Sequence, residues 1–286
     1  MIAEPERDEE IAIERLNALS RPYRDPVAQI PWTELDPARP WLPEPLVSLY
    51  ALPEYRALGP EQKLRLSQAE FVALCELGLW LESLFLARFG RDLLRRKSRA
   101  ASEYRLHELR EEAGHSLMFV ELIRRSGFPP LTPPALRPRL LGLLARRLPS
   151  GSPLFWAAVF LAEAVPDELN RRIAADAALP GAIRAIVLLH RREEGRHLAY
   201  ARSKLARDLP RLGKTARRAL APILRILLRQ FLDACFCVKA PVYAAAGIAD
   251  AARLARVARA SPARAALARE CLEPARHFLS KQGLDL

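Results

Sequence analysis

The feature that most constrains this chain is a glutamate in an apolar segment followed, a fixed distance later, by a Glu-x-x-His pair, an arrangement that occurs twice. The first glutamate stands in LGLWLESLFL and the second in WAAVFLAEAV, where an unpaired carboxylate would be costly. The separations are 30 and 31 residues, so two antiparallel helix pairs of matching length would place both sets at the same depth. The residues are Glu82 with Glu112 and His115, and Glu163 with Glu194 and His197.

Composition and periodicity agree with a helical chain. Glycine is scarce, with 12 in 286 residues, and half of the residues are hydrophobic. No segment shows a sustained two-residue alternation, so we predict an all-α fold. The expected helices cover about 61–94, 98–127, 135–147, 153–178 (with Pro166 inside), 180–208, 214–238, 241–259 and 262–279.

The first 60 residues differ from the rest because prolines crowd them. Proline removes a backbone donor and breaks helices. We therefore predict that residues 1–60 form an irregular arm packed on the body, with short helices near 9–18 and 45–57. Residues 61–286 are expected to form a single helical domain.

A third histidine extends the second motif. His190, Glu194 and His197 are spaced four and three residues apart, which places them within roughly 60° on one helix face. This row is either a polar stripe facing water or one wall of a metal site, and the two Glu-x-x-His pairs favour the metal site. Glu76 is an alternative to Glu82, but it would lie 36 residues before Glu112, so the matching separations favour Glu82.

The remaining acids and histidines receive more ordinary assignments. Glu111 and Glu193 adjoin the proposed ligands but point about 100° away, so we expect them at the surface or supporting the ligands. Glu70 and Glu168 are expected to be solvated. His107 is expected at the surface or as a supporting partner, and His277 is expected to be exposed.

The charge of +12 and pI of about 10.1 would suit an anionic partner. However, the arginines are spread along the helices among Leu and Ala, which favours solvated helix faces over binding to nucleic acid or to an anionic membrane. The four cysteines form no C-x-x-C pair and indicate buried thiols in a reducing cytoplasm. The acidic start of the chain is not a signal peptide, and the most apolar late stretch, 219–238, carries too many charges for a membrane span.

The ligand types indicate the chemistry. Paired carboxylates can bridge two metal ions about 4 Å apart and offset their charge, while neutral imidazoles complete the coordination. Helical bundles that hold two iron ions take one Glu from each of two helices and a Glu-x-x-His from each of the other two. We therefore expect a ferritin-like four-helix bundle core with additional N- and C-terminal helices, and two iron ions. Manganese in one position stays open from ligand types alone.

The pattern His-x-x-x-Glu-x-x-His resembles the p-aminobenzoate N-oxygenase family of di-iron enzymes. The similar segments are LWLESLF, REEAGHSLMF, VFLAEAV, LHRREEGRHLAY and AAAGI. The resemblance implies an oxygenase that takes electrons from an external donor, uses dioxygen as co-substrate and N-oxygenates an aryl amine. It also implies one iron at Glu82, Glu112 and His115, and the other at Glu163, His190, Glu194 and His197.

Several functions remain open at this stage. The leading hypothesis is the di-iron oxygenase acting on a small molecule. The alternatives are a di-iron hydroxylase or oxidase of another substrate, and a ferritin-like metal-binding protein without turnover. A basic nucleic-acid binder is the weakest reading. A homodimer is compatible with each of them.

Overall fold

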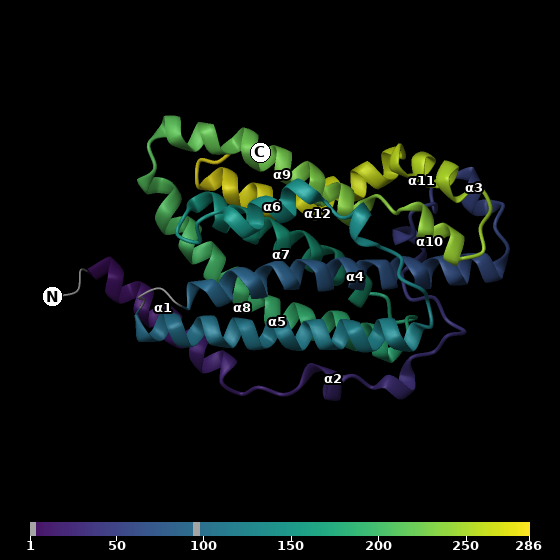
Figure 1. The fold of residues 1–286 in the computed structure, drawn as a ribbon, viewed down its shortest axis with the longest axis horizontal. Coiled ribbons are helices and arrows are strands. Elements are labelled where there is room, and N and C mark those ends of the chain that lie inside the picture. The colour runs from purple at the N-terminus through teal and green to yellow at the C-terminus, as the bar shows by residue number, and fades with distance from the viewer. Residues whose placement is uncertain (1–3, 94–97) are drawn as a thin grey trace.

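The computed structural model describes residues 4–93 and 98–286, and its regular elements there are all helical. Two long antiparallel helix pairs form the centre (Figure 1). The first pair is α4 (Pro60–Asp92) with α5 (Arg99–Ser126), and the second is α7 (Pro153–Ala174) with α8 (Gly181–Arg211). The predicted all-α bundle core is confirmed.

Local sequence signals set the ends of these helices. Ser98 accepts a hydrogen bond from the backbone N–H of Ala101, and Ser152 accepts one from Phe155, so each caps the helix that follows it. Gly127 ends α5 with a φ of 68°, a left-handed conformation that glycine adopts without strain. The two pairs therefore begin and end close to where the sequence predicted.

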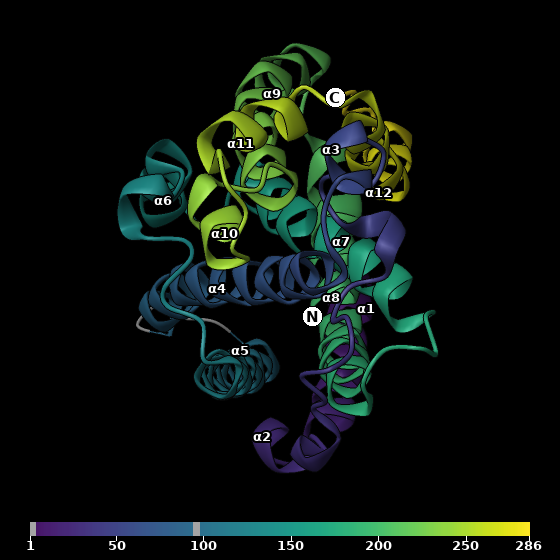
Figure 2. The same ribbon diagram turned by 90° about the vertical axis from the view of Figure 1, so that its right-hand side faces the viewer.

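The other helices cover the two sides of this centre. On one side α1 and α2 pack on α5, and on the other α9, α10 and α12 pack on α4 and α7 (Figures 1 and 2). Their bounds are α1 (Glu4–Ser20), α2 (Pro26–Gln29), α3 (Pro53–Arg56), α6 (Arg139–Arg147), α9 (Lys214–Phe236), α10 (Ala240–Ala245), α11 (Ala251–Arg259) and α12 (Pro262–Lys281). Short 3₁₀ turns lie at η1 (Trp32–Glu34), η2 (Glu44–Leu46) and η3 (Pro134–Leu136).

The structure differs from the predicted helices in a few places. The single helix expected over 241–259 is two helices, because Gly247 and Asp250 take positive φ angles of 70° and 53° between them. The helix expected over 45–57 is replaced by the separate η2 and α3. Pro166 lies inside α7 without ending it, and α7 stops at Ala174.

The N-terminal residues make specific contacts with the central helices. Asn17 is buried and donates a hydrogen bond to the backbone oxygen of Ala100, 3.0 Å away. The side-chain amide of Gln68 donates to the backbone oxygens of Pro37 and Arg39. The division of the chain into an arm (1–60) and one helical domain (61–286) stays a prediction. These contacts are compatible with it.

The apolar core lies between the four long helices and continues under α9 and α12. All four cysteines are free thiols, and Cys75, Cys235 and Cys271 are buried in this core. Among the described residues, no helix combines the length and apolar character needed to span a bilayer.

Candidate metal centre

All seven predicted ligands point into one buried region of the bundle. They come from four helices: Glu82 from α4, Glu112 and His115 from α5, Glu163 from α7, and His190, Glu194 and His197 from α8. Six of them are buried and His190 is half-buried. Their ligand atoms form two overlapping groups, and within each group the atoms lie within 4.8 Å of one another.

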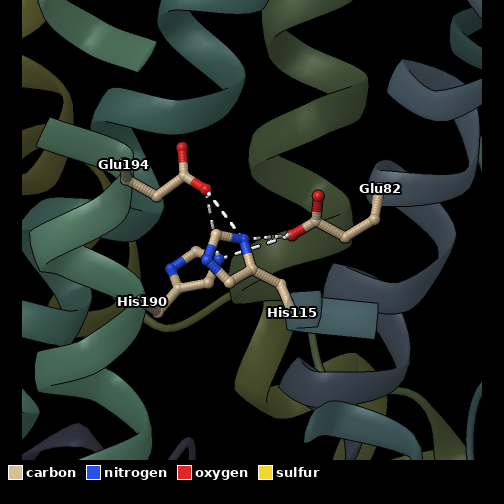
Figure 3. Close-up of side chains that lie close together, drawn as sticks. All are labelled: Glu82, His115, His190 and Glu194. Atoms are coloured by element: carbon tan, nitrogen blue, oxygen red, sulfur yellow. Dashed lines mark hydrogen bonds and ion pairs between the residues drawn. The ribbon is translucent and has the colours of Figure 1, made fainter. Parts of the chain in front are cut away.

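The first group contains Glu82, His115, His190 and Glu194 (Figure 3). The Nδ1 atom of His115 lies 3.3 Å from Oε1 of Glu194 and 3.8 Å from Oε1 of Glu82. The Nε2 atom of His190 lies 3.4 Å from that same oxygen of Glu82 and 3.6 Å from Oε1 of Glu194. Two imidazoles thus meet between two carboxylates from opposite helices.

The second group contains Glu112, Glu163, Glu194 and His197. Nδ1 of His197 lies 3.2 Å from Oε2 of Glu194 and 3.3 Å from Oε1 of Glu112. Glu194 therefore directs one oxygen to each group. Glu112 belongs to the second group only, but its Oε2 lies 3.9 Å from Nδ1 of His115 in the first. These two glutamates occupy the same position in the two Glu-x-x-His motifs.

The grouping differs from the allocation that the family resemblance implies. His190 lies beside His115, with ring centroids 4.6 Å apart, and both face Glu82. It therefore belongs with the first group and not with Glu163 and His197. The reason is the position of α8, which packs on α7 and also contacts α5. One end of its row, His190, reaches Glu82 of α4, while Glu194 and His197 group with Glu163 of α7.

Glu111 and Glu193 support the histidines in a crossed arrangement. Glu193 of α8 lies 3.0 Å from Nε2 of His115 on α5, and Glu111 of α5 lies 3.0 Å from Nε2 of His197 on α8. Both acids are buried. Each carboxylate can accept the Nε2–H of its histidine, which leaves Nδ1 free to face the acid cluster. Of the two positions that the sequence left open for them, the supporting one is correct.

Sequence reasoning missed one polar neighbour of the site. Asn170 of α7 lies with its side-chain nitrogen 3.4 Å from Nδ1 of His190. Asn170 follows Glu163 by seven residues, two helical turns, so both point the same way. That spacing is the signal that could have found it.

The other acids considered as candidates have structural roles. Glu76 accepts hydrogen bonds from the backbone N–H groups of Leu131 and Thr132, and so anchors the loop after α5. Glu76 is thus engaged elsewhere, whereas Glu82, which the spacing favoured, lies in the first group. The prediction that Glu70 is solvated is wrong: it is buried and accepts from the backbone N–H and hydroxyl of Ser48.

The electrostatics show that the acid cluster needs positive charge. Burial opposes protonation of His115 and His197, but hydrogen bonds and charges from the surrounding carboxylates raise the pKa of both above the ordinary range. Burial and then the charge on His115 lower the pKa of His190 to about 4. Burial and the charge of Glu194 raise the pKa of Glu163 well above its usual value.

The residues fit a pair of metal ions. Several buried ligand atoms have no hydrogen-bond partner among the described residues: both oxygens of Glu112, one oxygen each of Glu82 and Glu163, and Nδ1 of His115. Buried polar atoms are rarely left in this state, because each costs free energy. Metal ions would satisfy all of them, and the set of carboxylates and imidazoles suits iron or manganese.

An apolar cavity of about 90 Å³ adjoins the cluster. Glu82, Glu163, His190 and Glu194 form its polar end. Its remaining walls are largely aliphatic and aromatic, including Phe71, Leu81, Phe85, Phe119, Ile186 and Val187. The volume exceeds several-fold the ~10–15 Å³ that one water molecule needs, so a small organic molecule is the better occupant.

Comparison with known proteins agrees with this geometry. The family profile described as p-aminobenzoate N-oxygenase AurF matches residues 6–283. The chain belongs to this family. The AurF family membership confirms the resemblance stated from the sequence.

Curated relatives carry no assigned function. This member of the AurF family is 27% identical over 223 residues to an uncharacterized protein of Mycobacterium tuberculosis (strain ATCC 25618 / H37Rv), and equally to one of Mycobacterium bovis (strain ATCC BAA-935 / AF2122/97). The matches cover 73% of this chain and 64% of the relatives, so the chain spans somewhat less than two thirds of their length.

Solved structures with the same fold are variants of R2-like ligand-binding oxidases. One, with an anaerobically reconstituted Mn/Fe cofactor, has a TM-score of 0.56 at 14% identity and covers 97% of this chain and 93% of its own. Another, with an aerobically reconstituted Mn/Fe cofactor, has a TM-score of 0.54 at 14% identity, with 96% and 92% covered. At this identity the likeness confirms the predicted ferritin-like fold.

Proposed function

We propose that this protein is a non-haem di-metal oxygenase that uses dioxygen to oxidise a small organic molecule. The observation that carries the proposal is the convergence of four glutamates and three histidines from four helices at the end of an apolar cavity. Membership of the AurF family and the fold shared with oxidases that carry Mn/Fe cofactors support it.

The proposed ligands follow from the two groups of atoms. Glu194, which belongs to both groups, and Glu112, whose two oxygens face His115 and His197, would help to hold both ions. Glu82, His115 and His190 would complete the first site, and Glu163 and His197 the second. The ions are two irons, or iron with manganese, since both metals accept these ligands.

The bound metals would supply the redox chemistry with dioxygen. The protein's own residues hold them in place and control access. Four carboxylates offset the metal charge, and Glu111 and Glu193 fix the rings of His197 and His115. The apolar walls exclude water from the reacting end of the cavity, which prevents unproductive side reactions.

The cavity supports an aryl amine as substrate. Among the described residues, its lining includes no lysine or arginine, so an uncharged molecule is favoured over a strong anion. The rings of Phe71, Phe85 and Phe119 offer flat surfaces for an aromatic ring. The polar end places a substrate nitrogen near the metals, and we propose N-oxygenation there.

A second candidate is oxidation at carbon. The oxidases that share the fold and the strongly apolar walls favour a hydroxylase or oxidase of a hydrocarbon-like substrate on the same scaffold. An external electron donor is part of both candidates, because the metals must be reduced before dioxygen is used. The free thiols support a reducing compartment such as the cytoplasm. A homodimer stays a proposal.

Metal counting tests the proposed centre. We expect anaerobic protein loaded with ferrous iron to retain two ions per chain. Glu194→Ala should lose both, because Glu194 belongs to both groups. Glu82→Ala and Glu163→Ala should each weaken one site. Retention of two ions by Glu194→Ala, with the wild-type affinity, would refute the ligand assignment.

Product analysis tests the reaction. The reduced, metal-loaded protein is exposed to dioxygen with candidate aryl amines, and the products are identified by mass spectrometry. Hydroxylamine or nitro products are expected for N-oxygenation. Products oxidised only at carbon would favour the second candidate. Metal binding without oxidation of either kind of substrate would favour a metal-binding protein without turnover.

A further inference from the structure

The outer side of α6 exposes leucine side chains to solvent. The helix reads RLLGLLARR, and its Leu141 faces inward, where it lines a cavity. Leu140 and Leu143 turn outward instead and are 39% and 44% exposed. Arg139, Arg146 and Arg147 are also exposed on this helix. Its outer side is therefore a strip of leucine edged by arginine.

The neighbouring helix α9 repeats this arrangement. Its Leu224 and Leu227 line the same inner cavity, while Ile223 and Ile226 are 41% and 49% exposed. α6 and α9 contact each other and lie on the same side of the molecule, opposite α5 (Figures 1 and 2). We call the exposed residues of these two helices the α6–α9 face. Aliphatic side chains gathered at neighbouring positions usually mark an interaction surface.

The charge of the α6–α9 face is strongly positive. Residues 127–153 contain four arginines and no acid, and α9 contains five cations and one acid. That acid, Asp233, is already paired with Lys239 and Arg259 at 2.7 Å, so it does not neutralise the exposed arginines. On α9 these are Arg218, Arg225 and Arg229.

A second apolar cavity lies directly beneath this face. Its volume is about 50 Å³. α9 supplies four of its lining residues and α6 supplies Leu141, while α4 and α7 supply most of the rest, including Arg88. Leu81, Phe85 and Ala162 line both this cavity and the one that reaches the metal ligands. An apolar path interrupted by three side chains thus leads from the α6–α9 face toward the centre.

We propose that the α6–α9 face docks on an anionic phospholipid bilayer. Leu140, Leu143, Ile223 and Ile226 enter the headgroup boundary, and the flanking arginines contact lipid phosphates. A helix with aliphatic residues between cations binds such an interface without spanning it. A second copy of this chain would instead oppose two positive faces, and a nucleic acid would not cover exposed leucines and isoleucines.

Docking assigns the second cavity a role as an entry route for a lipophilic substrate. A lipophilic molecule dissolved in the bilayer can enter beneath α6 and α9 without crossing water, and then reach the metal ligands. This consequence rests on the proposed function, whereas the docking itself does not. Membrane attachment concerns one surface of the protein only and requires no transmembrane helix.

Vesicle co-sedimentation tests the docking. Full-length protein is mixed with vesicles of phosphatidylcholine, or of phosphatidylcholine containing phosphatidylglycerol, at low and at high salt. We expect binding to the anionic vesicles that weakens as salt rises, because each cation near the surface contributes attraction that salt screens. Ile223→Ser combined with Ile226→Ser should reduce the partition coefficient at least about tenfold.

The chain offers a matched control pair. Leu117 and Val120 of α5 have the same spacing as Ile223 and Ile226, are 59% and 46% exposed, and lie on the other side of the molecule. Leu117→Ser combined with Val120→Ser should leave vesicle binding unchanged. Equal loss in both double variants, or no binding of the wild type to anionic vesicles, would overturn the proposal.

Light scattering tests the remaining explanation, that the α6–α9 face is an interface between two copies of this chain. If the wild type is a dimer that the Ile223 and Ile226 substitutions convert to a monomer, and vesicles do not bind, the face is a self-interface and the proposal is wrong. Metal content is measured on the same samples. If protein that holds no metal still binds vesicles, the docking proposal stands and only the proposed function is contradicted.

Discussion

The nitrogen that His115 and His197 would offer to the metals is set by a carboxylate on the opposite helix. Glu193 reaches from α8 to His115 on α5, and Glu111 reaches from α5 to His197 on α8. Because both acids accept at Nε2, both histidines present Nδ1 to the cluster. This crossed pairing links the two helix pairs through the ligands themselves.

Neutralising either supporting acid should weaken metal binding without removing a ligand. We predict that Glu193→Gln and Glu111→Gln each lower metal affinity by about 10–100-fold, because the histidine loses a charged partner that orients it and raises its basicity. Competition with a metal chelator measures the affinity. Glu121→Gln, a change on α5 at an acid bonded to Arg124 and Arg125, is the control and should bind as the wild type does.

These variants also test whether the crossed pairs matter at all. Circular dichroism should show that both fold normally, since a glutamine amide oxygen can still accept from Nε2. Wild-type affinity in both Gln variants would contradict the role given to Glu111 and Glu193.

At the scale of elements, two glycines stand in the two Glu-x-x-His motifs and differ in what surrounds them. A Cβ added at Gly114 of α5 would lie 2.8 Å from the ring of Pro26 and from the hydroxyl of Tyr23. A Cβ added at Gly195 of α8 would meet no atom within 4 Å. Gly114 therefore lets the N-terminal residues lie against α5 beside His115.

Alanine at these two positions should change the free energy of unfolding in opposite directions. Gly114→Ala should lower the free energy of unfolding by about 1–3 kcal/mol, because Tyr23 and Pro26 must move. Gly195→Ala should raise it by about 0.5–1 kcal/mol, because alanine suits a helix interior better than glycine. Urea unfolding measures both. A stabilised Gly114→Ala variant would mean that residues 23–26 do not pack tightly on α5.

An ion-pair group fastens α1 to α8 and should respond to pH. Glu9 accepts from Lys204 at 2.6 Å and from Arg207. Burial opposes ionisation of Glu9, but these partners lower its pKa below the ordinary value of 4.5. A carboxyl with a lowered folded-state pKa contributes stability above its unfolded-state pKa, and loses it as the pH falls through the folded-state value.

Glu9→Gln should therefore cost stability at neutral pH and little in acid. The group is partly exposed, so we expect a loss of about 0.5–1 kcal/mol at pH 7 that shrinks once the pH falls below the ordinary value and also shrinks in high salt. Unfolding by urea along a pH series measures the difference from the wild type. A difference that grows as the pH falls would contradict the sign of this contribution.

The sequence predicted the end of an element well where a residue within one helical turn sets that end. Ser98, Ser152 and Gly127 act within one helical turn, so both ends of α5 and the start of α7 were close to expectation. The break before α11 depends on positive φ angles at Gly247 and Asp250, which no periodicity reveals. Glu70 is buried where Ser48 of the arm returns to α4 and donates to it, a contact that periodicity does not reveal.

At the scale of the whole molecule, the seven proposed ligands could be chosen from spacing, but the grouping of their atoms could not. Spacing along a helix fixes which side chains share a face, so it selected Glu82 over Glu76. Which carboxylate meets which histidine depends on how α8 lies against α5 and α7, and this is a property of the packed bundle. The group that His190 joins, and the histidine that each crossed acid contacts, were therefore beyond the reach of the sequence.

The same packing concentrates negative charge at the centre of the fold, and metal should stabilise the protein in consequence. Glu112, Glu163 and Glu194 are buried together, so their desolvation and mutual repulsion oppose folding unless cations offset them. Binding to the folded state at 100-fold excess over Kd contributes about 2.7 kcal/mol for one site. For a chain of this size we expect loading to raise Tm by at least about 5 °C.

The Glu163→Gln variant distinguishes this electrostatic effect from a general stabilisation of the fold by bound metal. Burial and the charge of Glu194 raise the pKa of Glu163, so ionisation of this carboxyl opposes folding at neutral pH. With a neutral amide in its place, the variant should unfold at a higher temperature than the wild type when both are stripped by a chelator. It should gain less than the wild type when iron is restored, because one ligand is weaker. Calorimetry of the four samples gives both differences. If the stripped variant were less stable than the stripped wild type, or gained as much from iron, the buried carboxylates would not carry the electrostatic cost assigned to them.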